Sequence, residues 1–182
     1  MIYKICVFIC KIISKIFYRV DVKNPVMLEA NKSYLICSNH IHLFDPILIA
    51  CNIKRPIRFM GKQELFRRKL LNWFFRKIGG FPVDRDGADL NAIKTSVNIL
   101  KNNEVLCIFP EGTRSKTGEL GKFKAGAGMI AIKGHTTIIP VKIEGNYKIF
   151  SKMKLIFGNE ISELGNNRDE LMKIVKTEIQ NI

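Results

Sequence analysis

The sequence predicts an α/β fold, a single domain with a largely parallel mixed sheet flanked by helices, preceded by an N-terminal amphipathic helix. After Pro25, short apolar runs alternate with longer helical patterns, which is typical of parallel strands joined by helices. The 182 residues, 47% of them hydrophobic, can enclose one core. No internal repeat or linker divides the chain, so we expect a helix at residues 1–20 and one domain at residues 21–182.

The first element is an apolar segment with regularly spaced basic residues, namely Lys4, Lys11, Lys15 and Arg19. Spacings of seven, four and four residues place these side chains on one narrow arc of a helix. A helix that spans a bilayer needs about 20 residues without central charges, and Lys11 and Lys15 interrupt this one. We therefore expect a helix that lies in an anionic membrane surface; packing of the same helix on its own domain is the open alternative.

The later elements follow from hydrophobic periodicity. Strands are expected at residues 33–38, 57–60, 80–83, 104–109, 137–143 and 153–157. Helices are expected at residues 46–52, 64–78, 88–101 and 168–179. The helix at 64–78 is apolar over more than half its circumference and carries interspersed basic residues. This pattern predicts a core helix. The alternatives are a second membrane-contacting face or the wall of a channel for an apolar chain.

The charge balance indicates an anionic partner. Thirty Lys and Arg residues against sixteen Asp and Glu residues give a formal net charge of +14. Nucleic acid, anionic lipid and phosphorylated substrates would all satisfy this charge. No zinc-finger pattern or stacking-aromatic RNA motif is present, so no nucleic acid partner is expected. Five cysteines without a C-x-x-C pair indicate a reducing compartment.

The segment SNHIHLFDP ends a predicted strand and opens a predicted helix. On a regular helix His40 and Asp45 would point about 140° apart, so the chain must turn between them. Pro46 disfavours helix at Asp45 and suits the first helical position, which predicts Asp45 as the N-cap. An ionised Asp45 would then orient His40 as a general base, or the pair is only a cap beside a hydrogen-bonded histidine. A metal site is not expected, since His42 and His135 supply too few further ligands.

Two further clusters follow predicted strands and would reach the same edge of a parallel sheet. In FPEGTRS, Gly112 permits close backbone approach, Thr113 can donate a hydrogen bond, and Arg114 offers a planar fork for a phosphate. In GGFPVDRDG, Arg85 would come to that edge. Two arginines near a histidine base indicate an anionic substrate with a hydroxyl group. Surface ion pairs with neighbouring carboxylates are the alternative for each arginine.

Taken together, these segments resemble the glycerolipid acyltransferase family, which includes the bacterial 1-acyl-sn-glycerol-3-phosphate (lysophosphatidic acid) acyltransferases. NHIHLFD is similar to the family's NHxxxxD motif. GGFPVDR, FPEGTRS and IIPVKI are similar to its second, third and fourth motifs and occur in the same order. The resemblance spans about residues 34–143 and implies a glycerol-3-phosphate acyltransferase-like fold.

The resemblance also implies a reaction. His40 would deprotonate the free hydroxyl of 1-acylglycerol-3-phosphate, Asp45 would hold His40, and the alkoxide would attack the thioester of acyl-CoA or acyl-carrier protein, which gives phosphatidic acid. No cofactor, metal or covalent enzyme intermediate is expected. The residues expected to bind the glycerol phosphate are Lys62, Arg85, Glu111, Gly112, Thr113 and Arg114, with Lys124 as a weaker match.

The motifs leave the acceptor headgroup open. Another lysophospholipid or a lyso-aminolipid is an alternative acceptor, and a non-catalytic basic membrane-binding module is the alternative from a different class. The expected location is peripheral or monotopic, on the cytoplasmic face of the cell membrane.

Overall fold

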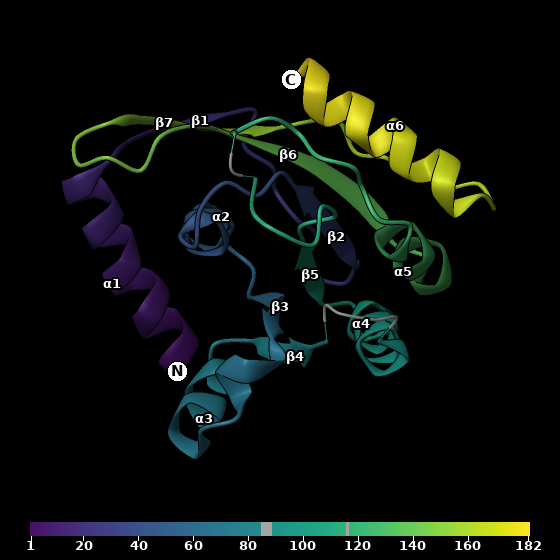
Figure 1. Cartoon of the computed structure of the whole chain (residues 1–182), viewed down its shortest axis with the longest axis horizontal. Coiled ribbons are helices and arrows are strands. Elements are labelled where there is room, and N and C mark those ends of the chain that lie inside the picture. The colour runs from purple at the N-terminus through teal and green to yellow at the C-terminus, as the bar shows by residue number, and fades with distance from the viewer. Residues whose placement is uncertain (85–88, 116) are drawn as a thin grey trace.

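In the computed structural model, which describes residues 1–84, 89–115 and 117–182, helices cover both faces of a sheet (Figure 1). The strands are β1 (Arg19–Lys23), β2 (Tyr34–Ser38), β3 (Ile57–Lys62), β4 (Gly80–Val83), β5 (Val105–Ile108), β6 (Thr137–Gly145) and β7 (Lys152–Phe157). The helices are α1 (Ile2–Phe17), α2 (Asp45–Asn52), the 3-10 helix η1 (Gln63–Phe66), α3 (Lys69–Lys77), α4 (Leu90–Lys101), α5 (Gly126–Gly134) and α6 (Arg168–Asn181).

The sheet has the strand order β1-β7-β6-β2-β5-β3-β4, and every pairing is parallel except that of β6 with β7. The central strands β2 and β5 are buried at every position, as expected of strands covered on both faces. Because β6, β2, β5 and β3 run in one direction, the loops that follow them meet at one edge of the sheet. The predicted fold class, with its largely parallel mixed sheet, is confirmed.

Successive residues of the central strands enter two separate cores. Leu35 of β2 and Leu106 of β5 pack in the core that α4, α5 and α6 cover. One residue further along, Ile36 and Cys107 pack in the core that α2 covers. The three later helices and α2 therefore lie on opposite faces of the sheet (Figure 1).

Helix α1 packs against α2 through one side only. The Ile57 N–H donates to the Tyr3 hydroxyl at 3.0 Å, and the Cys51 thiol donates to the Val7 carbonyl at 3.6 Å. Ser14 is buried, and its hydroxyl donates to the Lys11 carbonyl. Most of the exposed residues of α1 are apolar, and Lys4, Lys11 and Lys15 are exposed among them. In the part of the chain that the structure describes, no helix is both long and apolar enough to cross a bilayer.

The structure departs from the predicted elements in three places. The single helix expected at 64–78 is two, because Arg68 is extended between η1 and α3. None of the α3 residues is buried, so its interpretation as a core helix is wrong. Strand β1 and helix α5 were not predicted. Helix α5 contains helix-weakening glycines for a packing reason, since a Cβ at Gly128 would lie 2.6 Å from the Arg168 carbonyl oxygen.

Candidate active site

The loop after β2 brings His40 and Asp45 together as the sequence predicts. His40 Nδ1 lies 2.7 Å from Asp45 Oδ2, and the two residues are 6% and 0% exposed. A carboxylate oxygen accepts hydrogen bonds, so this contact favours the tautomer in which Nδ1 donates to Asp45. Phe109, the residue after β5, stacks on the imidazole with 4.1 Å between ring centroids. The ring of His40 is thus held in one plane with one nitrogen available as a base.

The expected capping role of Asp45 is wrong in its detail. Phe44 is the N-cap of α2 and Asp45 is its first residue, with Pro46 directly after it. The carboxylate does not bond the helix amides; it turns back, and Oδ2 accepts the backbone N–H groups of Ile41 and His42 at 2.7 and 2.8 Å. These bonds fold the His40-to-Asp45 segment into the turn that lets the pair meet.

The remaining oxygen of Asp45 has a partner that the sequence analysis missed. The Tyr147 hydroxyl donates to Oδ1 at 2.6 Å. Burial, followed by the negative charge of Asp45, raises the pKa of Tyr147, so it stays a protonated donor. The signal that could have found it is positional: Tyr147 follows β6, which is parallel to β2, and such a residue reaches the edge that carries His40.

Glu111 links the loop after β5 to His40. Its carboxylate oxygens accept the backbone N–H of His40 at 2.9 Å and that of Gly121 at 2.9 Å, and the residue is 8% exposed. In the same loop the Ser115 N–H donates to the His40 carbonyl at 2.7 Å. His40 is therefore fixed through both of its backbone polar groups. Glu111 therefore holds the backbone of His40 in place. A contact between Glu111 and a substrate stays a prediction.

Gly112 makes room for a lysine. Its φ is +73°, in the left-handed region that favours glycine, and a Cβ there would lie 2.9 Å from the Nζ of Lys124. The Lys124 backbone N–H donates to the Pro110 carbonyl at 2.9 Å, which keeps the lysine beside this loop. The ammonium group of Lys124 thus lies beside Gly112 of the FPEGTRS segment.

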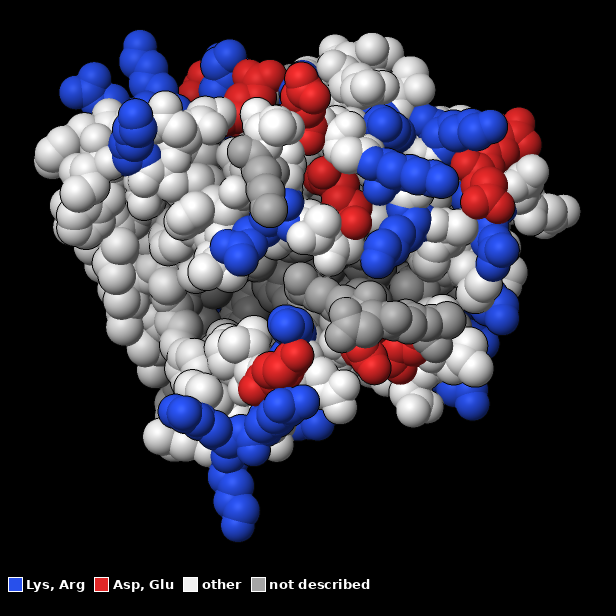
Figure 2. All heavy atoms as spheres, viewed as in Figure 1, with Lys and Arg blue, Asp and Glu red and all other residues white. Residues whose placement is uncertain are grey.

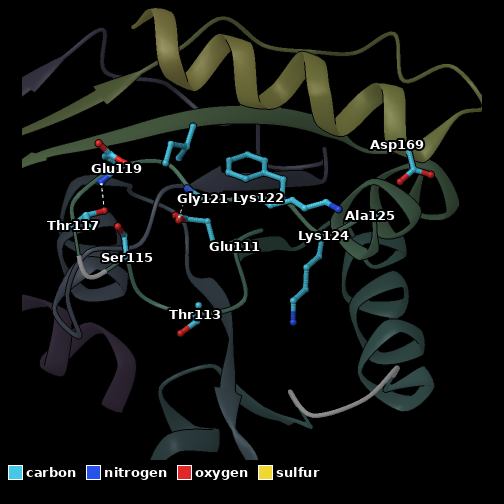
Figure 3. Close-up of a pocket in the computed structure, with 12 residues that line it drawn as sticks. Glu111, Thr113, Ser115, Thr117, Glu119, Gly121, Lys122, Lys124, Ala125 and Asp169 are labelled. Atoms are coloured by element: carbon cyan, nitrogen blue, oxygen red, sulfur yellow. Dashed lines mark hydrogen bonds between the residues drawn. The ribbon is translucent and has the colours of Figure 1, made fainter.

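A cleft of about 810 Å³ opens beside this loop. Figure 3 shows Glu111, Thr113 and Lys124 around it, with Asp169 of α6 at its rim. Ser115 and Lys122 also line the cleft. Hydroxyl and ammonium groups of this lining can bind an anionic group, and the carboxylates of Glu111, Glu119 and Asp169 also line the cleft.

The other residues predicted to bind substrate are more exposed. Thr113 and Arg114 are exposed in the loop after β5. Lys62 ends β3 at the same edge, and its Nζ lies 3.0 Å from a Glu64 carboxylate oxygen. Arg85 lies outside the described residues. The structure therefore brings Lys62, Thr113 and Arg114 to the sheet edge that carries His40, and it leaves their contact with a substrate as a prediction.

Other nucleophilic or metal-ligating groups near the pair have local roles. His42 accepts the Phe44 N–H and stacks on Tyr147 with 4.3 Å between ring centroids. Burial raises the pKa of the Cys107 thiol well above its usual range, so it is not a thiolate at neutral pH. Among residues 1–84, 89–115 and 117–182, no three His, Cys, Asp or Glu side chains are grouped to hold a metal ion.

Comparison with known proteins relates this chain to acyltransferases that act on lipids. The family model described as Acyltransferase matches residues 19–144. A 1-acyl-sn-glycerol-3-phosphate acyltransferase from Bacillus subtilis is 35% identical over 167 residues, covering 88% of this chain and 83% of that protein. The protein of the same name from Streptococcus pneumoniae is 31% identical over 159 residues, covering 82% of this chain and 59% of that one.

The fold has a counterpart among solved structures. The crystal structure of the 1-acyl-sn-glycerophosphate acyltransferase from Thermotoga maritima matches with a TM-score of 0.76 at 24% identity. The match covers 98% of this chain and 80% of that chain. It includes both helical layers and the sheet edge at which His40 lies.

Proposed function

The chain belongs to the Acyltransferase family, and on that premise we propose that it transfers a fatty acyl group from acyl-CoA or acyl-carrier protein to the free hydroxyl of 1-acylglycerol-3-phosphate. The product is phosphatidic acid. The names of the relatives from Bacillus and Streptococcus support this acceptor. The observation that carries the proposal is the buried His40–Asp45 pair, with Nδ1 and Oδ2 2.7 Å apart.

In the proposed mechanism, His40 Nε2 takes the proton of the acceptor hydroxyl as its oxygen attacks the thioester carbonyl carbon. The carboxylate of Asp45 stabilises the imidazolium that forms. The C–S bond of the tetrahedral intermediate then breaks, and the departing thiolate takes the proton from the imidazolium. General base catalysis of this kind contributes roughly 10²- to 10⁴-fold to the rate, and proximity of the bound substrates supplies more.

The acceptor phosphate is proposed to bind at the cationic side of the same edge. Arg114 can form two parallel hydrogen bonds with phosphate oxygens. Thr113 and Lys124 flank the cleft beside it, and Lys62 ends the neighbouring strand β3. Arg85 is included among the proposed phosphate-binding residues because it lies in the segment that resembles the family's second motif. A phosphate held here would place the glycerol hydroxyl toward His40.

We propose that the protein is monotopic, on the cytoplasmic face of the cell membrane, with the exposed side of α1 in the bilayer interface. Phe8, Ile12 and Ile16 are 65%, 45% and 58% exposed on that helix. Lys4, Lys11 and Lys15 are also exposed and would face anionic headgroups. The surface along α1, at the left of Figure 2, is largely uncharged.

Helix α3 is proposed to extend the same contact. Leu70 and Trp73 are 77% and 51% exposed, and basic side chains gather over this helix at the bottom of Figure 2. Both helices are linked to the start of β3: Tyr3 of α1 accepts the Ile57 N–H, and the carbonyl of Gly79, just after α3, accepts the Phe59 N–H. We propose that both exposed surfaces contact the same bilayer.

The activity is tested by incubating the purified protein with acyl-CoA or acyl-carrier protein and a panel of lysolipids, with products identified by mass spectrometry. The panel contains 1-acylglycerol-3-phosphate, the choline, ethanolamine and glycerol lysophospholipids, and a lyso-aminolipid. We expect phosphatidic acid to form fastest. Acylation of a different lysolipid would replace the proposed acceptor, and no acylated product with either donor would refute the enzyme proposal.

The membrane proposal is tested by sedimentation with vesicles that contain anionic lipid. Because α1 packs on α2, point substitutions are preferable to deletion of the helix. Phe8→Ser combined with Ile16→Ser should release the protein into the supernatant, whereas Ile174→Ser on α6, where Ile174 is 46% exposed, should not. Equal sedimentation of the double variant and the wild type would show that α1 does not make the contact.

A further inference from the structure

Asp45 has one hydrogen-bond partner that belongs to neither its own loop nor the base. Oδ2 accepts from His40 and from the backbone N–H groups of Ile41 and His42, whereas among the described residues Oδ1 accepts from the hydroxyl of Tyr147 alone, at 2.6 Å. A fully buried carboxylate is stabilised by such hydrogen bonds. The Tyr147 hydroxyl therefore engages the carboxylate oxygen that does not contact His40.

The ring of Tyr147 is itself held on several sides. It stacks on His42 with 4.3 Å between ring centroids, and it meets the rings of Tyr18 and Phe44 edge-on at 5.5 and 6.0 Å. Such aromatic contacts orient a ring without constraining its hydroxyl. The hydroxyl therefore arrives at Asp45 from a fixed direction.

The segment that carries Tyr147 is hydrogen-bonded to the end of α1. The Phe150 N–H donates to the Phe17 carbonyl at 2.7 Å, and the Arg19 N–H donates to the Ser151 carbonyl at 3.0 Å. Phe17 is the last residue of α1 and Arg19 the first of β1. The position of the Tyr147 hydroxyl thus depends on the chain that leaves the membrane-facing helix.

We propose that Tyr147 is a positioning residue for acyl transfer, whose hydroxyl holds Asp45 in the orientation that keeps His40 a base and ties that orientation to the end of α1. The proposal builds on the proposed function, because it concerns the same pair. It assigns a role to a residue that lies in none of the four motifs. Tyr147 does not touch the reacting atoms; it acts through Asp45.

Tyr147→Phe is the direct test, because it removes the hydroxyl and keeps the ring. We expect kcat to fall about 10-fold, with KM for lysolipid and acyl donor unchanged, since one charge-assisted hydrogen bond is lost. Tyr18→Phe is the matched control: Tyr18 contacts the rings of Phe44 and Tyr147, and its hydroxyl makes no hydrogen bond with any described residue. It should leave kcat and KM as in the wild type.

A second measurement does not depend on turnover. The proton shared by His40 Nδ1 and Asp45 should give a downfield proton NMR resonance in the free protein. This resonance should shift in Tyr147→Phe and not in Tyr18→Phe. A Tyr147→Phe variant with wild-type kcat and an unshifted resonance would overturn the proposal. If the resonance shifts although His40→Ala retains full activity, the proposed mechanism fails while the positioning of Asp45 by Tyr147 stands.

Discussion

The two halves of the candidate site are built in opposite ways. The half that carries the base is buried: His40 and Asp45 are 6% and 0% exposed, and both oxygens of Asp45 are hydrogen-bonded within the protein. The half that carries positive charge is open to solvent, since Thr113, Arg114 and Lys62 are all exposed. In the proposed mechanism the base is therefore oriented before substrate binds, whereas the exposed cationic side chains would be ordered only when the proposed phosphate binds.

This difference has a physical cause. A base must be held within a narrow range of orientations to take a proton, so burial and a dense set of hydrogen bonds are favourable there. A phosphate is a diffuse target that exposed cations can attract from a distance, and ordering each long side chain costs about 0.5–1.5 kcal/mol at binding. Changes in the first half should lower kcat, and changes in the second should raise KM.

The largest effect is expected for His40→Ala, because it removes the proton acceptor. We expect kcat to fall about 10³-fold or more, with KM for the lysolipid within about twofold of wild type. Initial rates over a range of lysolipid concentrations measure both constants. His135→Asn is a matched control: His135 is exposed with φ +47°, a conformation that Asn tolerates. A rise in KM in place of a fall in kcat would assign His40 to binding.

A smaller effect is expected for Asp45→Asn. The amide keeps the shape of the side chain but removes the charge that stabilises the imidazolium, so kcat should fall about 10²-fold. The thermal midpoint should be recorded with the rates, because Asp45 accepts two backbone N–H groups of its own turn. A rate loss that disappears at a temperature where the variant is fully folded would mean that Asp45 is structural only.

Arg114→Ala probes the open half of the site. Loss of the planar fork should raise KM for 1-acylglycerol-3-phosphate about 10-fold and leave kcat within about threefold of wild type. Arg114→Lys should recover part of the loss, because it restores the charge without the paired hydrogen bonds. Saturation curves for both variants give these values, and an unchanged KM in Arg114→Ala would remove this residue from phosphate binding.

The smallest effect is expected at Asp89, the N-cap of α4. Its carboxylate accepts the N–H groups of Asp84 and Ala92, and these bonds lower the pKa of Asp89. Asp89→Ala should lower the free energy of unfolding by about 1 kcal/mol at pH 7. Urea titration measures this loss, and Asp89→Asn, which can still cap α4, should retain most of the stability.

The pH dependence of that loss has a definite sign. A lowered pKa means that Asp89 stabilises the folded protein above the unfolded pKa, about 3.9, and that this contribution disappears as pH falls through the folded value. The wild type and Asp89→Ala should therefore converge in stability as the pH is lowered toward 2. A difference that persists unchanged there would have another origin, such as packing of the side chain.

The parts of the fold and site that depend on neighbouring residues could be predicted from the sequence. The turn between His40 and Asp45 follows from their spacing and from Pro46, and it is present in the structure. The contacts of Glu111 with His40 and of Tyr147 with Asp45 join residues 71 and 102 positions apart, so only the sheet register brings them together. Residue periodicity carries no information about such register.

Strand β1, helix α5 and the exposure of α3 could not be predicted, because each depends on the arrangement of the folded chain. Helix α5 has glycines that lower helix propensity, and its close approach to α6 compensates for them only in the folded protein. Strand β1 is an edge strand with alternating exposed residues, and its pairing with β7 lies far along the chain. In α3, the apolar side chains resemble those of a core helix, because composition cannot distinguish a surface that faces protein from one that is exposed.

A double-mutant cycle of Asp45→Asn with Arg114→Ala tests most directly whether the two halves act separately. If base orientation and phosphate binding are independent, the losses in kcat/KM multiply, so the double variant should be about 10³-fold below wild type when the single variants lose about 10²-fold and 10-fold. A double variant no slower than Asp45→Asn alone would contradict this account, because it would mean that Arg114 acts only through the His40–Asp45 pair.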